Sequence, residues 1–244
     1  MRYHQDEIAV PLARGERPAI WGLNLNVFPQ GHDDLKSAYE TWLAAATPLL
    51  VGTGAYLYPF EYTHVTASSP APFTNPTLAT WTQAERAEYR DAWLIALSAT
   101  CCASNAAGVA WPDAPFPLVF ETLELKDNCA IFVFRDETGG VAKIRGAVAA
   151  AAHHPALTSG RPAELLARSG FKTPNIVHSS IMRFAVPRAE GVTDDDVAER
   201  WAKAAKLWPG PVTVMSEKMT FITEAVAYQH IARGDGLLAE YLYA

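Results

Sequence analysis

The chain has 244 residues, of which half are apolar and 19% are charged, as is typical of a globular protein with a sizeable core. Its net charge of −6 argues against a protein that wraps long nucleic acid, but it permits a short phosphate-bearing ligand in a local basic cleft. No run of about 18 apolar residues predicts a membrane span, the first residues lack the apolar core of a signal peptide, and the three cysteines indicate reduced thiols of a cytoplasmic protein.

The first half of the chain predicts two strands and two long helices after a polar segment. Residues 1–19 are polar and contain two prolines, so we expect an extended N-terminal arm. The expected elements are strands over residues 20–28 and 57–68, and helices over residues 33–47 and 82–105. Thr82 and Glu85 fit a capping box at the start of the second helix. Three prolines between residues 70 and 76 predict a loop.

The second half loosely repeats this order of elements. Residues 111–117 contain three prolines, and we expect them to join the two halves. The expected elements are strands over residues 118–125, 130–134, 175–186, 212–223, 225–231 and 237–243, and helices over residues 140–153 and 194–208. Thr193 is the candidate cap of the last helix, whose first turn is acidic.

Two tripeptides on predicted strands each place a histidine two residues before a hydroxyl: His64-Val65-Thr66 and His178-Ser179-Ser180. Residues i and i+2 of a strand share a face, about 6.5–7 Å apart, so each motif presents an imidazole beside a hydroxyl. A histidine, with its usual pKa of about 6.5, is suited to proton transfer. Two such strands facing each other would supply an acid, a base and two donors for hydrolysis of a phosphodiester. The sequence does not decide which histidine is the acid.

Alternation along the two motif strands assigns further side chains to a face. Tyr62 lies on the face of the first motif and Met182 on that of the second, so both are candidate contacts for a base of the ligand, with core packing as an equal alternative. The same alternation places Arg183 on the opposite face, away from the expected cleft. Lys218 and Arg145 are candidate phosphate partners whose positions the pattern does not fix.

The remaining clusters are explained without a ligand. His153-His154 fits solvated residues at a helix C-terminus, Asp194-Asp195-Asp196 fits a helix first turn, and Cys101-Cys102 fits buried packing. The sequence has no phosphate loop, nucleophile elbow, dinucleotide fingerprint, Cys-x-x-Cys or His-Glu-x-x-His motif. We therefore expect neither a metal nor a cofactor.

The paired motifs, their strand context and the order of the elements resemble the 2H phosphoesterase superfamily, the group related to bacterial RNA 2′,3′-cyclic phosphodiesterases of the LigT type. The resemblance covers about residues 20–231 and includes Pro174 shortly before the second motif. It implies an α+β fold of two pseudo-symmetric lobes, each a small antiparallel sheet with outer helices, and an active cleft between them. We accordingly expect one bilobal domain over residues 20–244.

The resemblance also implies roles for the motif residues. His64 and His178 would be the acid and base, and Thr66 and Ser180 would clamp the phosphate, without a metal. The second motif departs from the family pattern, because Ser179 stands where a bulky apolar residue is more usual and Ser180 where threonine is commoner.

Two functions follow, together with a third interpretation. The first is a metal-independent phosphodiesterase for a cyclic phosphate or for a phosphodiester of a nucleotide or RNA end. The alternative is a non-catalytic module on the same scaffold that binds a phosphorylated small molecule, a nucleotide or an RNA end. Neither predicts a membrane or extended duplex nucleic acid as a partner. The third interpretation is a structural protein in which the motifs are coincidental. This interpretation predicts that the two histidines lie far apart.

Overall fold

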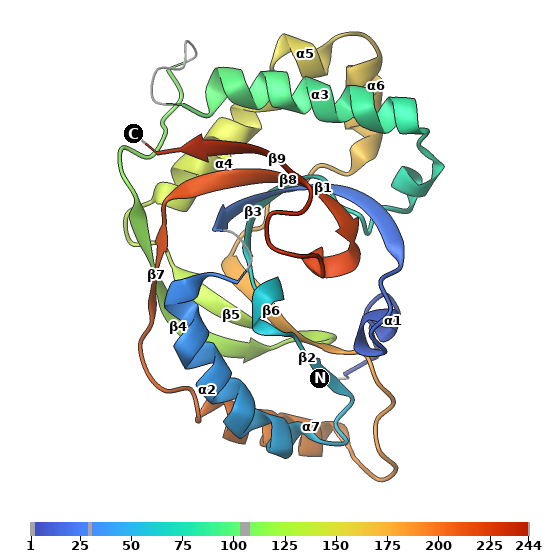
Figure 1. Ribbon diagram of the computed structural model, residues 1–244, viewed down its shortest axis with the longest axis vertical. Coiled ribbons are helices and arrows are strands. Elements are labelled where there is room, and N and C mark those ends of the chain that lie inside the picture. Colours follow the sequence, from blue (N-terminus) through green and yellow to red (C-terminus); the bar gives the residue numbers. More distant parts are fainter. Residues whose placement is uncertain (1–2, 29–30, 103–107, 244) are drawn as a thin grey trace.

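Two antiparallel sheets lie one above the other and divide the chain into two lobes (Figure 1). The structure is a computed structural model that describes residues 3–28, 31–102 and 108–243. Within these residues one sheet has four strands, in the order β3-β1-β8-β9, and the other has five, in the order β2-β6-β5-β4-β7. The predicted α+β fold with two lobes is confirmed.

All neighbouring strands in both sheets run antiparallel. The strands of the four-stranded sheet are β1 (Ala19–Phe28), β3 (Val65–Ala71), β8 (Lys218–Val226) and β9 (Leu237–Leu242). Those of the five-stranded sheet are β2 (Ala55–Leu57), β4 (Phe116–Leu125), β5 (Cys129–Arg135), β6 (Val177–Phe184) and β7 (Thr213–Ser216).

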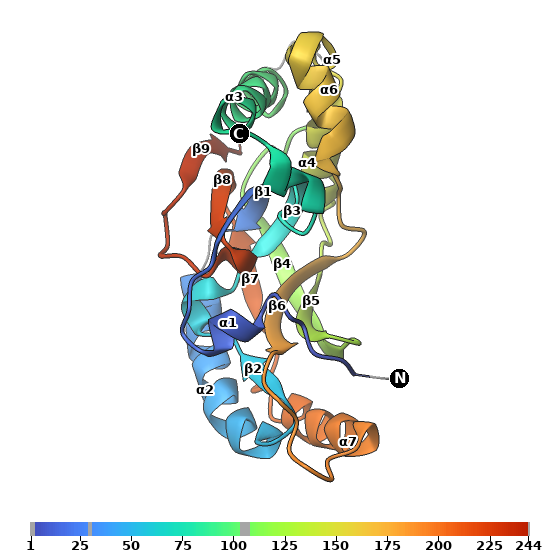
Figure 2. The same cartoon turned by 90° about the vertical axis from the view of Figure 1, so that its right-hand side faces the viewer.

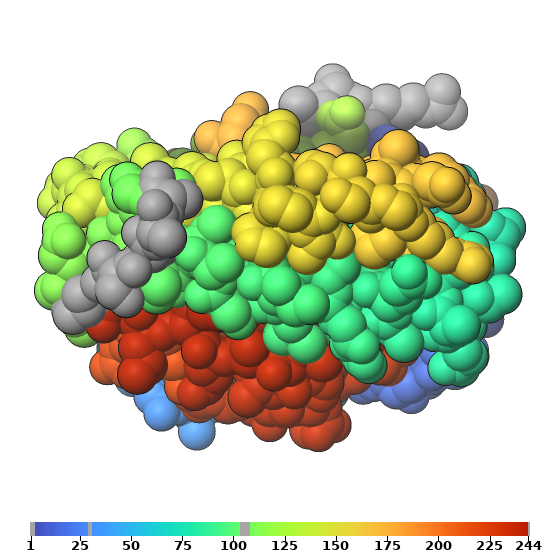
Figure 3. All heavy atoms as spheres, turned by 90° about the horizontal axis from the view of Figure 1, so that it is seen from above, coloured from blue at the N-terminus to red at the C-terminus, as the bar shows by residue number. Residues whose placement is uncertain are grey.

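The longer helices cover the outer faces of the two sheets (Figures 1 and 2). The four-stranded sheet is covered by α3 (Gln83–Thr100), α4 (Gly140–Ala151), α5 (Pro155–Thr158) and α6 (Gly160–Ser169). Figure 3 shows α3 as a band between the α5 and α6 segment and the C-terminal strands. The five-stranded sheet is covered by α2 (Asp33–Leu50) and α7 (Asp194–Ala205), and a short helix, α1 (Val10–Ala13), lies in the N-terminal segment.

Apolar side chains fill the space between each sheet and its helices, and polar ones face the other lobe. In the five-stranded lobe the ring of Trp42 lies 6.1 Å from that of Phe132 and 6.1 Å from that of Trp201. Along β1, Leu23 and Leu25 are fully buried in the core, whereas the asparagines between and after them line pockets on the opposite face. The alternation of β1 thus produces one core face and one polar face that is directed into the space between the lobes.

Most expected elements are present, but three predicted strands differ from the observed ones. The strand expected over residues 57–68 is interrupted by a 3-10 turn, η1 (Phe60–Tyr62), and β3 then continues through Pro70. Proline is tolerated there because β3 is the edge strand of its sheet. The strand expected over residues 212–223 is divided into β7 and β8, which belong to different sheets. The strand expected over residues 225–231 is not separate, because β8 continues to Val226 and a second 3-10 turn, η3 (Ala227–Gln229), follows it.

Helices α5 and α6 were not expected from the sequence. Pro162 lies in the first turn of α6, where proline is compatible with a helix, and α6 ends at Ser169 before Gly170, which has the left-handed conformation with φ +72°. The last helix, α7, begins as predicted, with a capping box between Thr193 and Asp196. Within the residues that the structure describes, no helix is both long and apolar enough to cross a membrane.

The two lobes are not the two halves of the sequence. Strands β1 and β3 of the first half pair with β8 and β9 from the C-terminal end, and β2 pairs with β6. Residues 111–117 connect α3 to β4, which is one of several places where the chain passes between the lobes. This interleaving brings one histidine motif into each lobe.

Candidate active site

The two histidine motifs lie where the lobes meet. His64 immediately precedes β3 of the four-stranded sheet, and His178 lies on β6 of the five-stranded sheet. Strands β3 and β6 contact each other across the boundary between the lobes. The expectation tied to a structural protein, that the two motifs lie far apart, is therefore not met.

In the first motif the imidazole of His64 is held by its own backbone. Its Nδ1 lies 2.8 Å from the carbonyl oxygen of Tyr62, so Nδ1–H donates to that carbonyl and Nε2 is left to accept a proton. Thr66 follows on β3, opposite Asn26 of β1 on the polar face of the sheet. Burial, with a smaller effect of a charge on His178, lowers the pKa of His64 to about 4 against the opposing effect of the hydrogen bond to Tyr62. His64 is accordingly neutral at pH 7, the form that a general base requires.

The second motif is built in the same way. His178 and Ser180 lie opposite Val133 and Ile131 of β5, on one face of the sheet. Nδ1 of His178 lies 3.5 Å from the carbonyl oxygen of Ile176, again two residues earlier in the chain. Burial lowers the pKa of His178, and the nearby cations Arg145, Arg183 and Lys126 lower it further.

Hydrogen bonds between the lobes fix one motif relative to the other. The backbone N–H of His64 donates to Oγ of Ser179 over 3.2 Å, so the middle residue of the second motif holds the first. Arg145 of α4 donates to the carbonyl oxygens of Ala67 on β3 and Ile176 before β6, over 3.3 and 2.8 Å. The side chain of Arg145, a candidate phosphate partner, is thus engaged by the backbone of both motif segments.

One cavity of about 430 Å³, which we call the motif pocket, is lined by three of the four residues predicted to act on the phosphate. It is lined by His64 and Thr66 of the first motif and by Ser180 of the second. His178 is two residues from Ser180 on the same face of β6, but it is not among the residues that line the motif pocket. The other lining residues are Asp6, Ile8, Asn24, Ser69, Pro72, Phe73, Thr74, Asn128, Lys172, Arg183, Glu224 and Tyr228.

A β-bulge in β6 corrects two expectations about this strand. Ser180 pairs with Ile131 and Met182 with Ala130, so Ile181 is an extra residue on β6. An extra residue exchanges the two faces of the strand beyond it. Met182 therefore points into the core, where it is 1% exposed, and does not face the pocket as a base contact would. Arg183, expected on the opposite face, lines the motif pocket instead.

Tyr62, the other candidate base contact, also lies apart from the motif pocket. It belongs to the turn η1 and not to a strand, so the alternation that predicted its face does not apply. Its ring stacks on the imidazole of His230 with the centroids 4.3 Å apart, and Arg17 donates to its hydroxyl over 3.4 Å. The structure thus brings together His64, Thr66 and Ser180, but not Tyr62 or Met182.

A buried ion pair lies in the floor of the motif pocket. Nη1 of Arg183 lies 2.9 Å from Oδ2 of Asp6, which also accepts a hydrogen bond of 2.8 Å from the hydroxyl of Tyr228. The guanidinium carbon of Arg183 lies 4.1 Å from the centroid of the Tyr228 ring. Sequence reasoning missed Asp6 because it lies in the presumed arm and meets Arg183 only through the tertiary fold.

A second buried carboxyl, that of Glu224 on β8, lines the motif pocket and forms hydrogen bonds with its neighbours. It accepts hydrogen bonds from the side-chain amide of Asn24 over 2.5 Å and from the backbone N–H of Gln229 over 3.1 Å. Tyr228 and Gln229 have φ angles of +55° and +56°, which are uncommon for residues other than glycine. Burial raises the pKa of Glu224 to about 8, so this side chain is mostly protonated at pH 7.

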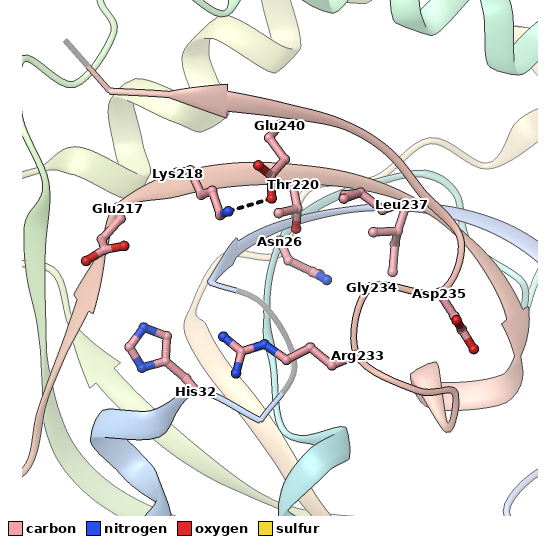
Figure 4. Close-up of a pocket in the computed structure, with 11 residues that line it drawn as sticks. Asn26, His32, Glu217, Lys218, Thr220, Arg233, Gly234, Asp235, Leu237 and Glu240 are labelled. Atoms are coloured by element: carbon pink, nitrogen blue, oxygen red, sulfur yellow. Dashed lines mark ion pairs between the residues drawn. The ribbon is translucent and has the colours of Figure 1, made fainter.

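Lys218, the remaining candidate phosphate partner, lies outside the motif pocket. It forms an ion pair with Glu240 beside a separate cavity of about 220 Å³, whose lining also includes Asn26, His32 and Arg233 (Figure 4). In the described part of the chain, no group of three or more His, Cys, Asp or Glu side chains is arranged to hold a metal ion.

The bond between the motifs predicts a measurable effect of Ser179. Ser179→Ala removes the acceptor of the His64 N–H from a fully buried site, and we expect the free energy of unfolding in urea to fall by about 1–2 kcal/mol. Ser37→Ala is a matched control, because Ser37 is exposed on α2. An unchanged unfolding free energy for Ser179→Ala would show that this bond does not hold the motifs.

Comparisons with known proteins support the fold. No family model and no curated protein sequence matches the chain. Among solved structures, protein TT0787 of Thermus thermophilus matches 91% of this chain and 97% of its own, with a TM-score of 0.50 and 13% identity. A phosphoesterase matches 92% of this chain and 99% of its own, also with a TM-score of 0.50 and 13% identity. Escherichia coli LigT in complex with phosphate matches 93% and 99%, with a TM-score of 0.48 and 10% identity.

The first two likenesses, at 13% identity, show a shared fold. They bear out the fold of two lobes that the resemblance implied.

Proposed function

We propose that this protein is a phosphodiesterase that hydrolyses a cyclic phosphate, or a phosphodiester of a nucleotide or RNA end, by acid and base catalysis with two histidines and without a metal. The observation that carries the proposal is the meeting of two His-x-hydroxyl motifs from different lobes at one boundary, with His64, Thr66 and Ser180 lining one pocket. The likeness of the fold to a solved phosphoesterase supports a phosphoester as the substrate.

In this proposal His64 is the base for hydrolysis. Its Nδ1 is occupied by the carbonyl of Tyr62 and its ring is neutral, so Nε2 accepts a proton from water as the water oxygen bonds to phosphorus. His178 donates a proton to the leaving oxygen as the bond from that oxygen to phosphorus breaks. A bound anion favours the charged form of His178 and thereby opposes the effect of burial on its pKa.

The phosphate oxygens would be held by hydroxyl and cationic groups. Thr66 and Ser180 supply hydroxyl donors, and Lys172 supplies positive charge at the same pocket, whereas the charge of Arg183 is paired with Asp6. Lys172 thus gives the pocket a positive charge on a chain whose net charge is −6. A cavity of about 430 Å³ suits a mononucleotide or the end of an RNA strand better than an extended duplex.

The proposal is tested with a panel of 2′,3′-cyclic nucleotides and 2′,5′-linked oligonucleotides. We expect turnover of at least one of them, at a rate that excess EDTA leaves unchanged. The matched control is the same reaction after EDTA treatment with Mg²⁺ or Zn²⁺ restored. Binding of a panel member without turnover would favour the non-catalytic module, and a loss of rate in EDTA that a metal restores would contradict metal independence.

A further inference from the structure

We infer that Asp6, from the N-terminal segment, sets the charge selectivity of the motif pocket, so that the site holds a singly charged phosphodiester at least as well as a doubly charged phosphomonoester. The inference rests on the proposed function and adds the substrate's charge state and the residue that selects it. Its basis is that Arg183, the arginine that lines the motif pocket, is already paired there with a carboxylate.

The carboxylate of Asp6 is fixed and not available for displacement by a ligand. Its side chain is 6% exposed and that of Arg183 is 14% exposed. Oδ2 accepts from Arg183 and Tyr228, and Oδ1 accepts from the backbone N–H groups of Ile8 and Ala9 over 3.1 and 3.3 Å. The backbone N–H of Asp6 donates to the carbonyl oxygen of Phe184 over 2.6 Å. This set of bonds ties the N-terminal segment to the end of β6.

The remaining charges of the motif pocket leave it weakly positive. Arg183 and Asp6 cancel each other, and Lys172 is exposed and cationic. Burial keeps His64 neutral at pH 7 and, by raising the pKa of Glu224, keeps most of that carboxyl protonated. A single negative charge on the ligand therefore balances the charge of the lining, whereas a second would be buried without a counter-charge, which is costly.

This selectivity matches the direction of the proposed reaction. Hydrolysis converts a phosphodiester with one negative charge into a phosphomonoester whose second ionisation has a pKa of about 6. The product thus carries close to two charges at neutral pH, and a pocket balanced for one charge releases it. Removing the charge of Asp6 would unmask Arg183 and turn the pocket into a site that retains the product.

The inference is tested by binding of two small probes, dimethyl phosphate with one charge and methyl phosphate with close to two, at about pH 7.3. For the unmodified protein we expect the two dissociation constants to agree within about threefold, or dimethyl phosphate to bind more tightly. For Asp6→Asn, which keeps the size and an oxygen for the N–H groups of Ile8 and Ala9, we expect methyl phosphate to bind at least about tenfold more tightly.

Glu7→Gln is the matched control, because it changes the net charge equally at an exposed neighbour outside the motif pocket. Its methyl phosphate affinity should stay within about twofold of the unmodified protein. In Arg183→Gln the effect of Asp6→Asn should disappear, because there is no cation left to unmask.

Each outcome separates the inference from the proposed function. If the unmodified protein binds methyl phosphate about tenfold or more tightly than dimethyl phosphate, the inference is overturned and the phosphodiesterase proposal stays intact. This measurement does not depend on the folding of any variant. The inference is likewise overturned, with the phosphodiesterase proposal intact, if Asp6→Asn and Glu7→Gln change the affinity for methyl phosphate equally. If neither probe binds the unmodified protein, the motif pocket is not a phosphate site, and the proposed function fails together with the inference.

Discussion

Replacing His64 with alanine is expected to lower kcat/KM for the phosphodiester substrate by about 10²–10⁴-fold, because the variant loses the base that takes the proton from water. His178→Ala should cause a loss of similar size, because the leaving oxygen then departs without a proton. The measurement is kcat/KM for the substrate that the panel identifies, together with the midpoint of urea unfolding for each variant. We expect both variants to fold.

The double variant sharpens this test. Two groups that act in one step are strongly non-additive, so His64→Ala combined with His178→Ala should lose little more than either change alone. His153→Ala is the matched control, because His153 is exposed at the end of α4 and outside the motif pocket. A folded single variant that keeps its rate within about threefold would contradict the assignment of that histidine.

The parts of the site that the sequence predicted are those that depend on local spacing. On any regular strand, a histidine two residues before a hydroxyl residue lies on the same face as that residue. The position of His178 beside Ser180 on one face of the strand therefore follows from the sequence alone. The same spacing relates His64 to Thr66 across the start of β3, and both line the motif pocket. The likeness of the fold to a phosphoesterase supports the element order on which the predicted resemblance was based.

The sequence-based predictions failed where one extra residue shifted the alternation of a strand, and where a residue reaches the site through a contact with a distant part of the chain. The bulge at Ile181 exchanges Met182 and Arg183 between the core and the motif pocket, and nothing in an apolar-polar pattern marks the position of such a bulge. Asp6 enters the pocket because the N-terminal segment is bonded to the end of β6, far away in the sequence. Periodicity carries no information about such a contact.

The buried ionisable groups around the site predict a maximum of folding stability near pH 6.5. Burial lowers the pKa of His64 and of His230 to about 4, from 6.5 in the unfolded chain, and it lowers the pKa of His178 as well. As the pH falls from 6.5 toward 4, the unfolded chain binds protons that the folded chain does not. The free energy of unfolding therefore falls on the acid side, by about 1.4 kcal/mol per pH unit for each of His64 and His230, and His178 acts in the same direction.

Glu224 has the opposite effect on the alkaline side. Its pKa is raised from 4.5 to about 8, so it stays protonated in the folded chain while the unfolded chain releases its proton. Its favourable contribution to the free energy of unfolding is fully present below pH 4.5 and is lost as the pH rises through 8. Between pH 4.5 and 6.5 the histidines outweigh it and stability rises with pH. Above pH 6.5 it acts alone, and stability falls by about 1.4 kcal/mol per pH unit until pH 8.

Urea unfolding between about pH 4.5 and 8.5 measures both slopes. Glu224→Gln should remove the decline in the free energy of unfolding above pH 6.5. His230→Phe keeps a ring beside Tyr62, and it should reduce the slope of the unfolding free energy on the acid side by the contribution of about one titrating group. The two slopes are assigned to different residues, so the decline above pH 6.5 should respond to Glu224→Gln and not to His230→Phe. A stability that is flat from pH 6.5 to 8 in the unmodified protein would mean that Glu224 is ionised in the folded state, with the donors from Asn24 and Gln229 holding its charge.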